Sequence, residues 1–434
     1  MASTQPGRTS CSPQDGCGQA GAQVDGAGAR RSFTGLLMTW GLTRLVLLLW
    51  VFKVWVFPGP DVTSDVSVIY QGWYDVLRTG TFPLGDVTWQ YPPAAALAVL
   101  SPALLPFLQY AQAFFVLACL ADLVVLSLLA YAGVRPGRTL RGAWVWVVGV
   151  PLLGPTVYAR YDVMVTAVAV AALLAGARHP RAAGVLVGIG AMLKVWPAVL
   201  LLGVRRRSWG WAVGTVAVVA GLFALFMPGA FQFLTFQKNR GTEVESLGSL
   251  VIHVARHVGA WDGQVLLNYG SIEFLGPWVT AVSTGALFLT GVAFGWLLLW
   301  RLMATRFLPT TLADAAFVAV LMFTVTSRVI SPQYMVWLVG TAAVCLCFRG
   351  SRMRAPAYLA LAACFVTVLE FPLWFQHVVA SDTRGITLLL LRNGLLVVAA
   401  VLGARELWRS TVSREPVPSL PAQATRTKEP STPA

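Results

Sequence analysis

Apolar runs of about 15 to 27 residues, close to the length that a helix needs to cross a bilayer, recur from residue 36 to residue 404. A chain inside a bilayer must satisfy its backbone hydrogen bonds internally, so runs of this length fold as helices there. Charged residues make up only 12% of the chain, whereas an ordinary soluble domain carries roughly 25%. The sequence therefore predicts an all-α polytopic membrane protein, with the lipid bilayer as a partner.

Arginines between the apolar runs predict the topology. The formal net charge is +14, which in a soluble protein would suggest a nucleic-acid partner. Here the excess lies in short loops, where Arg marks the cytoplasmic side of a membrane. The basic clusters span residues 135–141, 178–181, 205–207, 301–306 and 349–354. We therefore place these loops in the cytoplasm and predict no nucleic-acid partner.

The alternation of these clusters predicts about 12 spans with both termini inside. The predicted spans are Leu36–Phe57, Tyr110–Val134, 142–157, 160–177, 182–195, 196–204, 208–228, 276–302, 311–327, 332–348, 355–373 and 386–404. Residues 182–204 are too few for two full spans, so we predict a hairpin that is broken at Lys194–Pro197 and buried against other helices. Pro93–Phe107 is short and contains prolines, which predicts an interfacial or re-entrant helix.

This topology predicts three parts of the chain. Residues 1–32 and 407–434 form low-complexity cytoplasmic tails that we expect to be disordered, and residues 33–406 form the transmembrane domain. Two long polar loops, 58–92 and 229–275, face outward. Together with short connections at residues 158–162, 194–197 and 328–334 they are the natural walls of a cavity, because polar backbone at membrane depth must be buried or line a cavity.

Asp65 is the candidate catalytic base. It lies in the polar loop after the first span, where a carboxylate can accept a proton from an attacking hydroxyl. Asp61 follows a Pro-Gly-Pro turn and suits a structural cap, whereas Asp86 follows a glycine and suits a turn. If Asp65 is not the base, Asp86, Glu243 and Glu245 are the next candidates.

Four cations near the outer ends of the apolar runs are candidate partners for an anionic head group: Lys194, Arg160, Arg240 and Arg328. A charged side chain inside a membrane is costly, so Lys194 in an apolar hairpin is a functional candidate. The alternative is a lysine whose long stem carries its ammonium to the interface. Arginine can bind phosphate oxygens in pairs, which suits the proposed role of the other three.

No motif indicates a bound nucleotide or metal. The sequence contains no phosphate-binding glycine loop, dinucleotide fingerprint or serine-hydrolase elbow. His253 and His257 would share a helix face with Asp262 nearby, but two histidines at this spacing are common by chance. We therefore predict no metal and no cofactor.

Several short motifs occur in an order that carries a resemblance. They are Asp65 with Tyr70 and Trp73, Tyr91-Pro92-Pro93, Arg160-Tyr161-Asp162, Lys194-Val195-Trp196-Pro197, Arg240-Gly241 with Glu245-Ser246, and Ser331-Pro332-Gln333-Tyr334. The ordered set resembles the GT-C glycosyltransferases, specifically glycosyltransferase family 87, the actinobacterial polyprenyl-phosphate-mannose-dependent alpha-mannosyltransferases. The resemblance covers roughly residues 36–400.

The resemblance implies a GT-C fold with interfacial helices in the first outer loop, in the bacterial cytoplasmic membrane. It implies inverting transfer of mannose from a polyprenyl monophosphate carrier to a glycolipid or lipoglycan acceptor on the outer face. Asp65 would then be the base, and the four cations would hold the donor phosphate. The remaining candidates for the substrate cavity are Tyr70, Trp73, Tyr91, Asp162, Glu245, Gln333 and Tyr334.

Two other functions fit the same features. A lipid-linked sugar flippase or another transporter would also use intramembrane charges and broken helices. Against a transporter, the polar loops are long and crowded on one side. A related GT-C enzyme could use another polyprenyl-phosphate sugar, such as arabinose or glucose.

Overall fold

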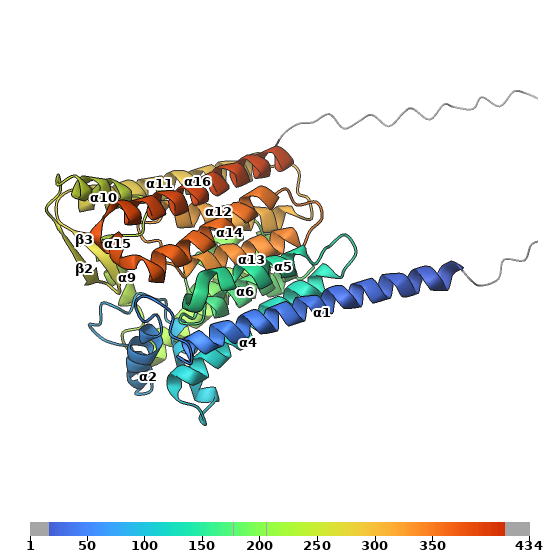
Figure 1. Ribbon diagram of the computed structural model, residues 1–434, viewed down its shortest axis with the longest axis horizontal. Helices are drawn as coiled ribbons and strands as arrows, with labels where there is room; N and C mark the ends of the chain where they lie inside the picture. Colours follow the sequence, from blue (N-terminus) through green and yellow to red (C-terminus); the bar gives the residue numbers. More distant parts are fainter. Residues whose placement is uncertain (1–16, 177, 205, 413–434) are drawn as a thin grey trace, which may run out of the picture.

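The computed structural model describes residues 17–176, 178–204 and 206–412. Helices run side by side along the molecule, and the 58–92 and 229–275 segments gather at one end of them (Figure 1). The first residues of α1 (Cys17–Val51) and the last residues of α16 (Thr383–Thr411) lie toward the opposite end of the bundle. Residues 1–16 and 413–434, which make up most of the predicted tails, lie outside the described residues. The inner parts of both tails are helical, because α1 and α16 extend into them.

Among the described residues, six helical stretches are long and apolar enough to cross a membrane, so the chain is a membrane protein. Besides parts of α1 and α16, they are α4 (Tyr110–Gly133), α8 (Arg206–Phe226), α11 (Val279–Met303), and α14 (Arg354–Val368) with the π-helix η5 (Leu369–Leu373). Each overlaps a predicted span. A short helix, α15 (Phe375–Ala380), separates η5 from α16.

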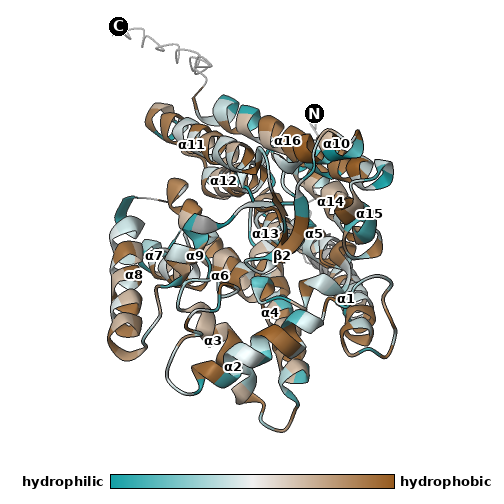
Figure 2. Ribbon diagram, turned by 90° about the vertical axis from the view of Figure 1, so that its left-hand side faces the viewer, coloured by the Kyte–Doolittle hydropathy of each residue, from teal (hydrophilic) through white to brown (hydrophobic). Residues whose placement is uncertain are grey.

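Shorter apolar helices form the interior of the bundle. They are α6 (Asp162–Ala175), α7 (Pro180–Leu193), α12 (Thr311–Thr326) and α13 (Tyr334–Leu346). A 13-residue helix such as α13 is only about 20 Å long, against roughly 30 Å of hydrocarbon core. Every residue from Met335 to Leu346 is buried, and α13 lies near the centre of the bundle with α1, α8 and α11 at its edge (Figure 2). How many of these helices cross the membrane stays a prediction.

Two predicted spans are broken by proline. After α5 (Arg141–Gly149), the chain continues as the 3₁₀ helix η3 (Pro151–Val157), which is kinked at Gly154. The predicted hairpin break is confirmed, because α7 ends at Leu193, Lys194 is extended, and the 3₁₀ helix η4 (Trp196–Leu202) follows. Pro197 explains this end, since a proline ring clashes with the carbonyl four residues earlier.

The 58–92 segment contains two joined helices. The π-helix η1 (Asp65–Tyr70) begins at the candidate base and continues directly into α2 (Gln71–Leu77). The predicted interfacial helix within 93–107 consists of α3 (Ala95–Leu100) and the 3₁₀ helix η2 (Ser101–Leu104). Its position at a membrane surface stays a prediction.

The 229–275 segment contains a small sheet, so the prediction of an all-α chain was wrong here. Helices α9 (Phe233–Asn239) and α10 (Ser249–His257) accompany three strands, β1 (Thr242–Glu243), β2 (Gln264–Asn268) and β3 (Ser271–Leu275). The strands pair antiparallel in the order β1-β3-β2. Tyr269 and Gly270 both have positive φ, as a tight two-residue hairpin turn requires. The short strands carry too little alternating pattern to stand out among apolar runs.

A buried ion pair joins the first helix to the bundle. Arg44 of α1 lies 2.7 Å from the carboxylate of Asp122 in α4, and both side chains are almost fully buried. Arg44 also donates to the carbonyls of Trp146 and Val147, while Tyr158 donates to Asp122. Every charge in this group therefore has close partners, as a charge at membrane depth requires.

Candidate active site

A cavity of ≈ 420 Å³ brings together residues from the 58–92 segment, the break after α7, the 229–275 segment and the connection before α13. Most of the predicted site residues line it: Asp65, Tyr70, Trp73, Tyr91, Lys194, Arg240, Arg328, Gln333 and Tyr334. These residues are far apart in the sequence, so the folded chain assembles a single site from four of the five predicted walls, and the connection at residues 158–162 does not line it. Arg160, Asp162 and Glu245 do not line the cavity.

Asp65 is the one acidic side chain among the described residues that line this cavity. Its carboxylate is 32% exposed and lies 2.5 Å from Nη2 of Arg160. Nη1 of Arg160 donates to the carbonyls of Val62 and Ala159. Arg160, which we predicted as a phosphate partner, is therefore engaged in holding the loop and Asp65, and it lies behind the cavity wall.

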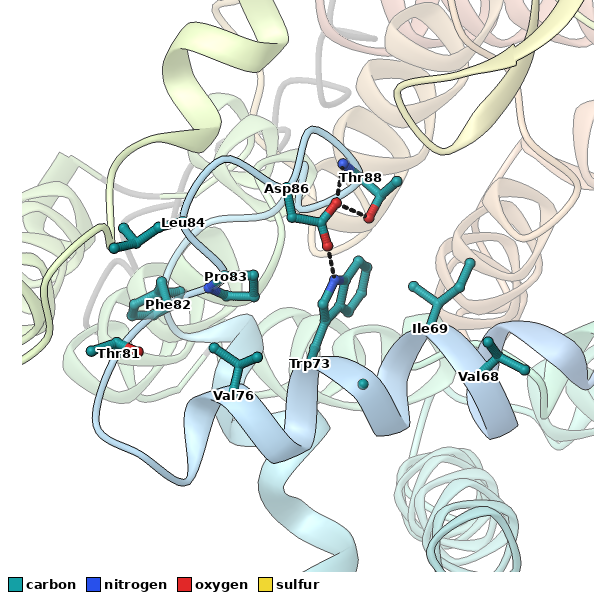
Figure 3. Close-up of a pocket in the computed structure, with 11 residues that line it drawn as sticks. Val68, Ile69, Trp73, Val76, Thr81, Phe82, Pro83, Leu84, Asp86 and Thr88 are labelled. Atoms are coloured by element: carbon teal, nitrogen blue, oxygen red, sulfur yellow. Dashed lines mark hydrogen bonds between the residues drawn. The ribbon is translucent and has the colours of Figure 1, made fainter.

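The two competing aspartates form matching turns. Asp61 and Asp86 each begin an Asp-Val-Thr sequence, and each accepts hydrogen bonds from the backbone N–H and the hydroxyl of the threonine two residues later. Asp61 also pairs with Lys53. Asp86 accepts a further bond from the indole of Trp73, which Figure 3 shows together with its turn. Both carboxylates therefore stabilise loops, as the sequence predicted for Asp61 and Asp86.

Lys194 points its ammonium into the protein rather than toward the outside. Its Nζ lies 2.7 and 2.9 Å from the two carboxylate oxygens of Asp162, which also accepts from the indole of Trp337 at 2.7 Å. Four ring centroids surround the ammonium at 5.0 to 5.6 Å, those of Tyr91, Tyr161, Tyr334 and Trp337. Aromatic faces attract a cation. These contacts disagree with the alternative that the Lys194 ammonium extends to the membrane interface.

Arg240 and Arg328 supply two further positive charges to the wall of the cavity. Arg240 pairs with Glu273 at 3.2 Å and donates to Ser271 Oγ at 2.8 Å, so the small sheet holds it in place. Arg328 donates to the carbonyl of Gln237 and, at 3.4 Å, to Ser283 Oγ. The two guanidiniums and Lys194 come from three different segments and place three cationic side chains on the wall of the cavity.

A stack of aromatic rings forms another part of the wall. Tyr334 stacks on Trp337 with ring centroids 4.0 Å apart, and Trp196 stacks on Trp337 at 5.1 Å. Burial raises the pKa of Tyr91 to about 12, so this hydroxyl stays protonated at neutral pH. The cavity therefore offers flat apolar faces next to its charges.

Glu245 is not part of the cavity, which corrects the prediction. It is buried next to Arg392 of α16, whose guanidinium lies 3.9 Å from Glu245 and 3.1 Å from Glu370. Burial raises the pKa of Glu245 well above its usual range, and the neighbouring Glu370 raises it further. Glu243 is also buried, and Ser331, a cavity residue, donates to it at 2.8 Å. These carboxylates support the wall from behind.

The histidines make structural contacts. His253 lies between Val244 O, at 2.7 Å from Nε2, and Ser381 Oγ, at 2.8 Å from Nδ1. A carbonyl only accepts, so Nε2 carries the proton. His257 lies 3.1 Å from the carbonyl of Ser381. Among the described residues, no group of three His, Cys, Asp or Glu side chains is arranged to hold a metal ion.

Trp196 and Trp337 line the cavity but were not among the predicted site residues. Trp196 lies inside a motif that we used for Lys194, and Trp337 lies one helical turn after Tyr334. Their aromatic side chains and their positions close to Lys194 and Tyr334 were the features of the sequence that could have indicated them. The contact of Trp337 with Asp162 joins residues 175 positions apart, and no local pattern predicts such a pair.

One family model and one solved structure are similar to this chain. A family model described as glycosyltransferase family 87 matches residues 89–332, which are 244 of the 434 residues. The matched range contains Lys194, Arg240 and Arg328, whereas Asp65 precedes it. No curated protein sequence matches the chain. The crystal structure of ArnT from Cupriavidus metallidurans bound to undecaprenyl phosphate is similar, with 15% identity, a TM-score of 0.43, and coverage of 86% of this chain and 78% of that chain.

Proposed function

Because the chain belongs to glycosyltransferase family 87, we propose that it transfers mannose from a polyprenyl monophosphate carrier to a glycolipid or lipoglycan acceptor. One observation carries this proposal: the cavity has a single carboxylate, Asp65, and three cations among its described lining residues. A sugar phosphate ester needs both kinds of group. Cations stabilise the phosphate that leaves, and a carboxylate removes the proton of the attacking hydroxyl.

The donor phosphate binds to Lys194, Arg240 and Arg328 in this proposal. Charge-assisted hydrogen bonds to phosphate are stronger than neutral ones, and arginine can make them in pairs. The negative charge on the phosphate grows as its bond to the anomeric carbon breaks. Cations that are already held in place by Asp162, Glu273 and the carbonyl of Gln237 need no rearrangement at that moment.

Asp65 acts as the base on the acceptor side. The acceptor oxygen forms a bond to the anomeric carbon as the carbon–phosphate oxygen bond breaks, and the hydroxyl proton passes to Asp65. Attack opposite the leaving phosphate inverts the anomeric configuration. Arg160 is a positioning residue, because its 2.5 Å contact orients the carboxylate without reaching the cavity wall. The reaction needs no metal or other cofactor, since the three cations supply the positive charge.

The stacked rings of Tyr334, Trp337 and Trp196 suit the sugar itself. A pyranose presents flat patches of C–H groups, and aromatic faces pack against such apolar surface. Tyr70 and Trp73, stacked at 5.3 Å, offer a second aromatic face beside Asp65. Gln333 adds an amide that can bond to sugar hydroxyls.

The site faces the extracytoplasmic side in this proposal. The 58–92 and 229–275 segments lie together at one end of the bundle (Figure 1), and the Arg-rich loops predict that the other end is cytoplasmic. In a variant without native cysteines, an impermeant thiol reagent applied from outside should label Thr79→Cys and not Arg352→Cys, both of which are exposed positions. Reversed labelling would place Asp65 in the cytoplasm.

The donor assay tests the function. Purified protein is incubated with polyprenyl-phosphate mannose, glucose or arabinose and a set of glycolipid acceptors, and the product is analysed. We expect a mannosylated product. Turnover with another sugar would assign a different donor, whereas movement of the donor across a vesicle membrane without turnover would indicate a flippase.

A further inference from the structure

A second cavity, of ≈ 520 Å³ (Figure 3), shares lining residues with the cavity that contains Asp65. Its lining residues come from the η1–α2 helix and from the loop that follows it: Val68, Ile69, Gly72, Trp73, Val76, Thr81, Phe82, Pro83, Leu84, Asp86 and Thr88. Ile69, Trp73 and Thr88 line both cavities. A molecule that occupies the second cavity therefore lies against the wall of the catalytic one.

The helix that begins at Asp65 connects the two cavities. Its lining residues follow Asp65 at intervals of three to four positions, through Ile69 and Trp73 to Val76, so they share one face of the helix. At about 1.5 Å per residue, Val76 lies roughly 16 Å along the helix from Asp65. A ligand along this face would have one end beside the candidate base.

The walls of the second cavity fit hydrocarbon. Val68, Val76 and Leu84 are 67%, 37% and 58% exposed, so their apolar side chains are accessible to a ligand. The carboxylate of Asp86 is already used by Thr88 and Trp73. The cavity thus offers apolar surface and few free hydrogen-bonding groups, which suits the chain of a lipid.

We propose that this cavity binds the hydrocarbon part of a lipid-linked acceptor, whose sugar hydroxyl reaches Asp65. The inference rests on the proposed function. The donor phosphate is assigned to Lys194, Arg240 and Arg328, which come from other elements and do not line the second cavity. Because the acceptor attacks opposite the phosphate, the ligand that lies along the helix of Asp65 is the acceptor.

Gly72 provides a direct test. It is exposed on α2, lines the second cavity, and a Cβ added there meets no atom within 4 Å. Because the added Cβ has open space, Gly72→Trp should place its ring in the cavity. Gly72→Ala is the matched control for the loss of glycine. Gly210→Trp controls for a large ring on an exposed helical glycine elsewhere, because Gly210 on α8 also has no atom within 4 Å of an added Cβ.

The assay compares two acceptors that share a mannoside but carry a long alkyl chain or a methyl group. Each CH₂ group removed from water raises the affinity roughly fourfold. If two or three CH₂ groups of the acceptor are no longer buried, its affinity should fall by about 15- to 60-fold. We expect Gly72→Trp to raise the KM of the long-chain acceptor by this factor. The KM of the methyl mannoside and that of the donor should stay within about threefold, and both controls should behave like the wild type.

Two results would overturn the inference. A raised donor KM in Gly72→Trp would assign the cavity to the donor chain. Unchanged kinetics with both acceptors would show that the cavity holds at most an ordinary membrane lipid. If Gly72→Trp fails to fold, Val76→Trp on the same face answers the same question. A wild-type protein that transfers no sugar at all refutes the proposed function, whereas an active wild type with an unaffected Gly72→Trp refutes this inference alone.

Discussion

Two ion pairs in this protein differ in what surrounds them. Arg44–Asp122 joins two long helices, with side chains that are 1% and 0% exposed, and its charges contact only protein groups among the described residues. Arg160–Asp65 joins the connection before α6 to the first residue of η1, and the carboxylate is 32% exposed on a cavity wall. The first pair is closed to ligands and the second is open on one side.

Access to a ligand distinguishes an ion pair that only stabilises the fold from one that can take part in a reaction. Ionisable groups in a membrane protein are functional candidates by default, and burial alone would rank Arg44 and Asp122 above Asp65. Their contacts instead indicate a link between α1 and α4. Access to the cavity, rather than burial, is the reason that the proposed mechanism assigns roles to Asp65 and Lys194. The following predictions test this distinction, from the largest effect to the smallest.

Asp65→Asn should reduce the transfer rate by about 10²- to 10⁴-fold, because an amide cannot take the hydroxyl proton at neutral pH. Asn retains the size of Asp and can still bond to Arg160, so the unfolding free energy should change by only about 1 kcal/mol or less. Single-turnover kinetics and denaturant unfolding measure the two quantities. A variant that keeps more than about a tenth of the wild-type rate would exclude Asp65 as the base.

Arg44→Met should lower stability strongly and change turnover little, which is the opposite of Asp65→Asn. Removing one partner of a buried pair leaves an uncompensated charge on Asp122 and should cost about 3–5 kcal/mol of unfolding free energy. The turnover of the folded fraction should stay within about twofold, since the pair does not line the cavity. The double variant Arg44→Met/Asp122→Leu should recover most of the loss. A large decrease in turnover per folded molecule would end the interpretation as a purely structural pair.

Lys194→Ala should raise the donor KM, lower turnover, or both, by about 10- to 150-fold. This range corresponds to one charge-assisted contact worth about 1.5–3 kcal/mol. The change also leaves Asp162 without its cation, so Lys194→Ala/Asp162→Asn is the necessary control for that unpaired carboxylate. Activity that returns in the double variant would assign Lys194 a structural role.

His253 should make stability depend on pH. Burial lowers the pKa of His253 to about 4 from its usual 6.5, so the unfolded chain binds a proton at a higher pH than the folded one. Stability should therefore fall as the pH decreases from 6.5 toward 4, by about 1.3 kcal/mol between pH 7.5 and 5.5. His253→Gln should lose this component. An unchanged pH dependence of thermal unfolding in His253→Gln would refute the assignment.

The sequence predicted the helical elements because apolar runs and Arg loops are local patterns. It also predicted the break at Lys194–Pro197, where proline prevents the helix from continuing. The small sheet was missed because β1 pairs only Thr242 and Glu243 with residues some 30 positions later. Such short strands gain stability from tertiary contacts rather than from their own sequence.

The site was predictable in part. Residues at the break after α7 and in the loops do meet in one cavity, which the placement of polar residues in apolar surroundings indicated. The roles of Arg160 and Glu245 could not be inferred, because their partners, Asp65 and Arg392, lie about 95 and 147 positions away. Arg160 and Glu245 differ from Lys194 and Arg240, which are also ion-paired, in that they do not line the cavity.

The central claim is that the cations bind the donor phosphate and Asp65 acts only on the acceptor. Equilibrium binding of radiolabelled polyprenyl-phosphate mannose to wild type, Asp65→Asn and Lys194→Ala in detergent tests this division directly. We predict that Asp65→Asn binds the donor with a Kd within about threefold of wild type although it does not transfer mannose, and that Lys194→Ala binds it at least about 10-fold more weakly. Lost donor binding in Asp65→Asn, or wild-type binding in Lys194→Ala, would contradict the account.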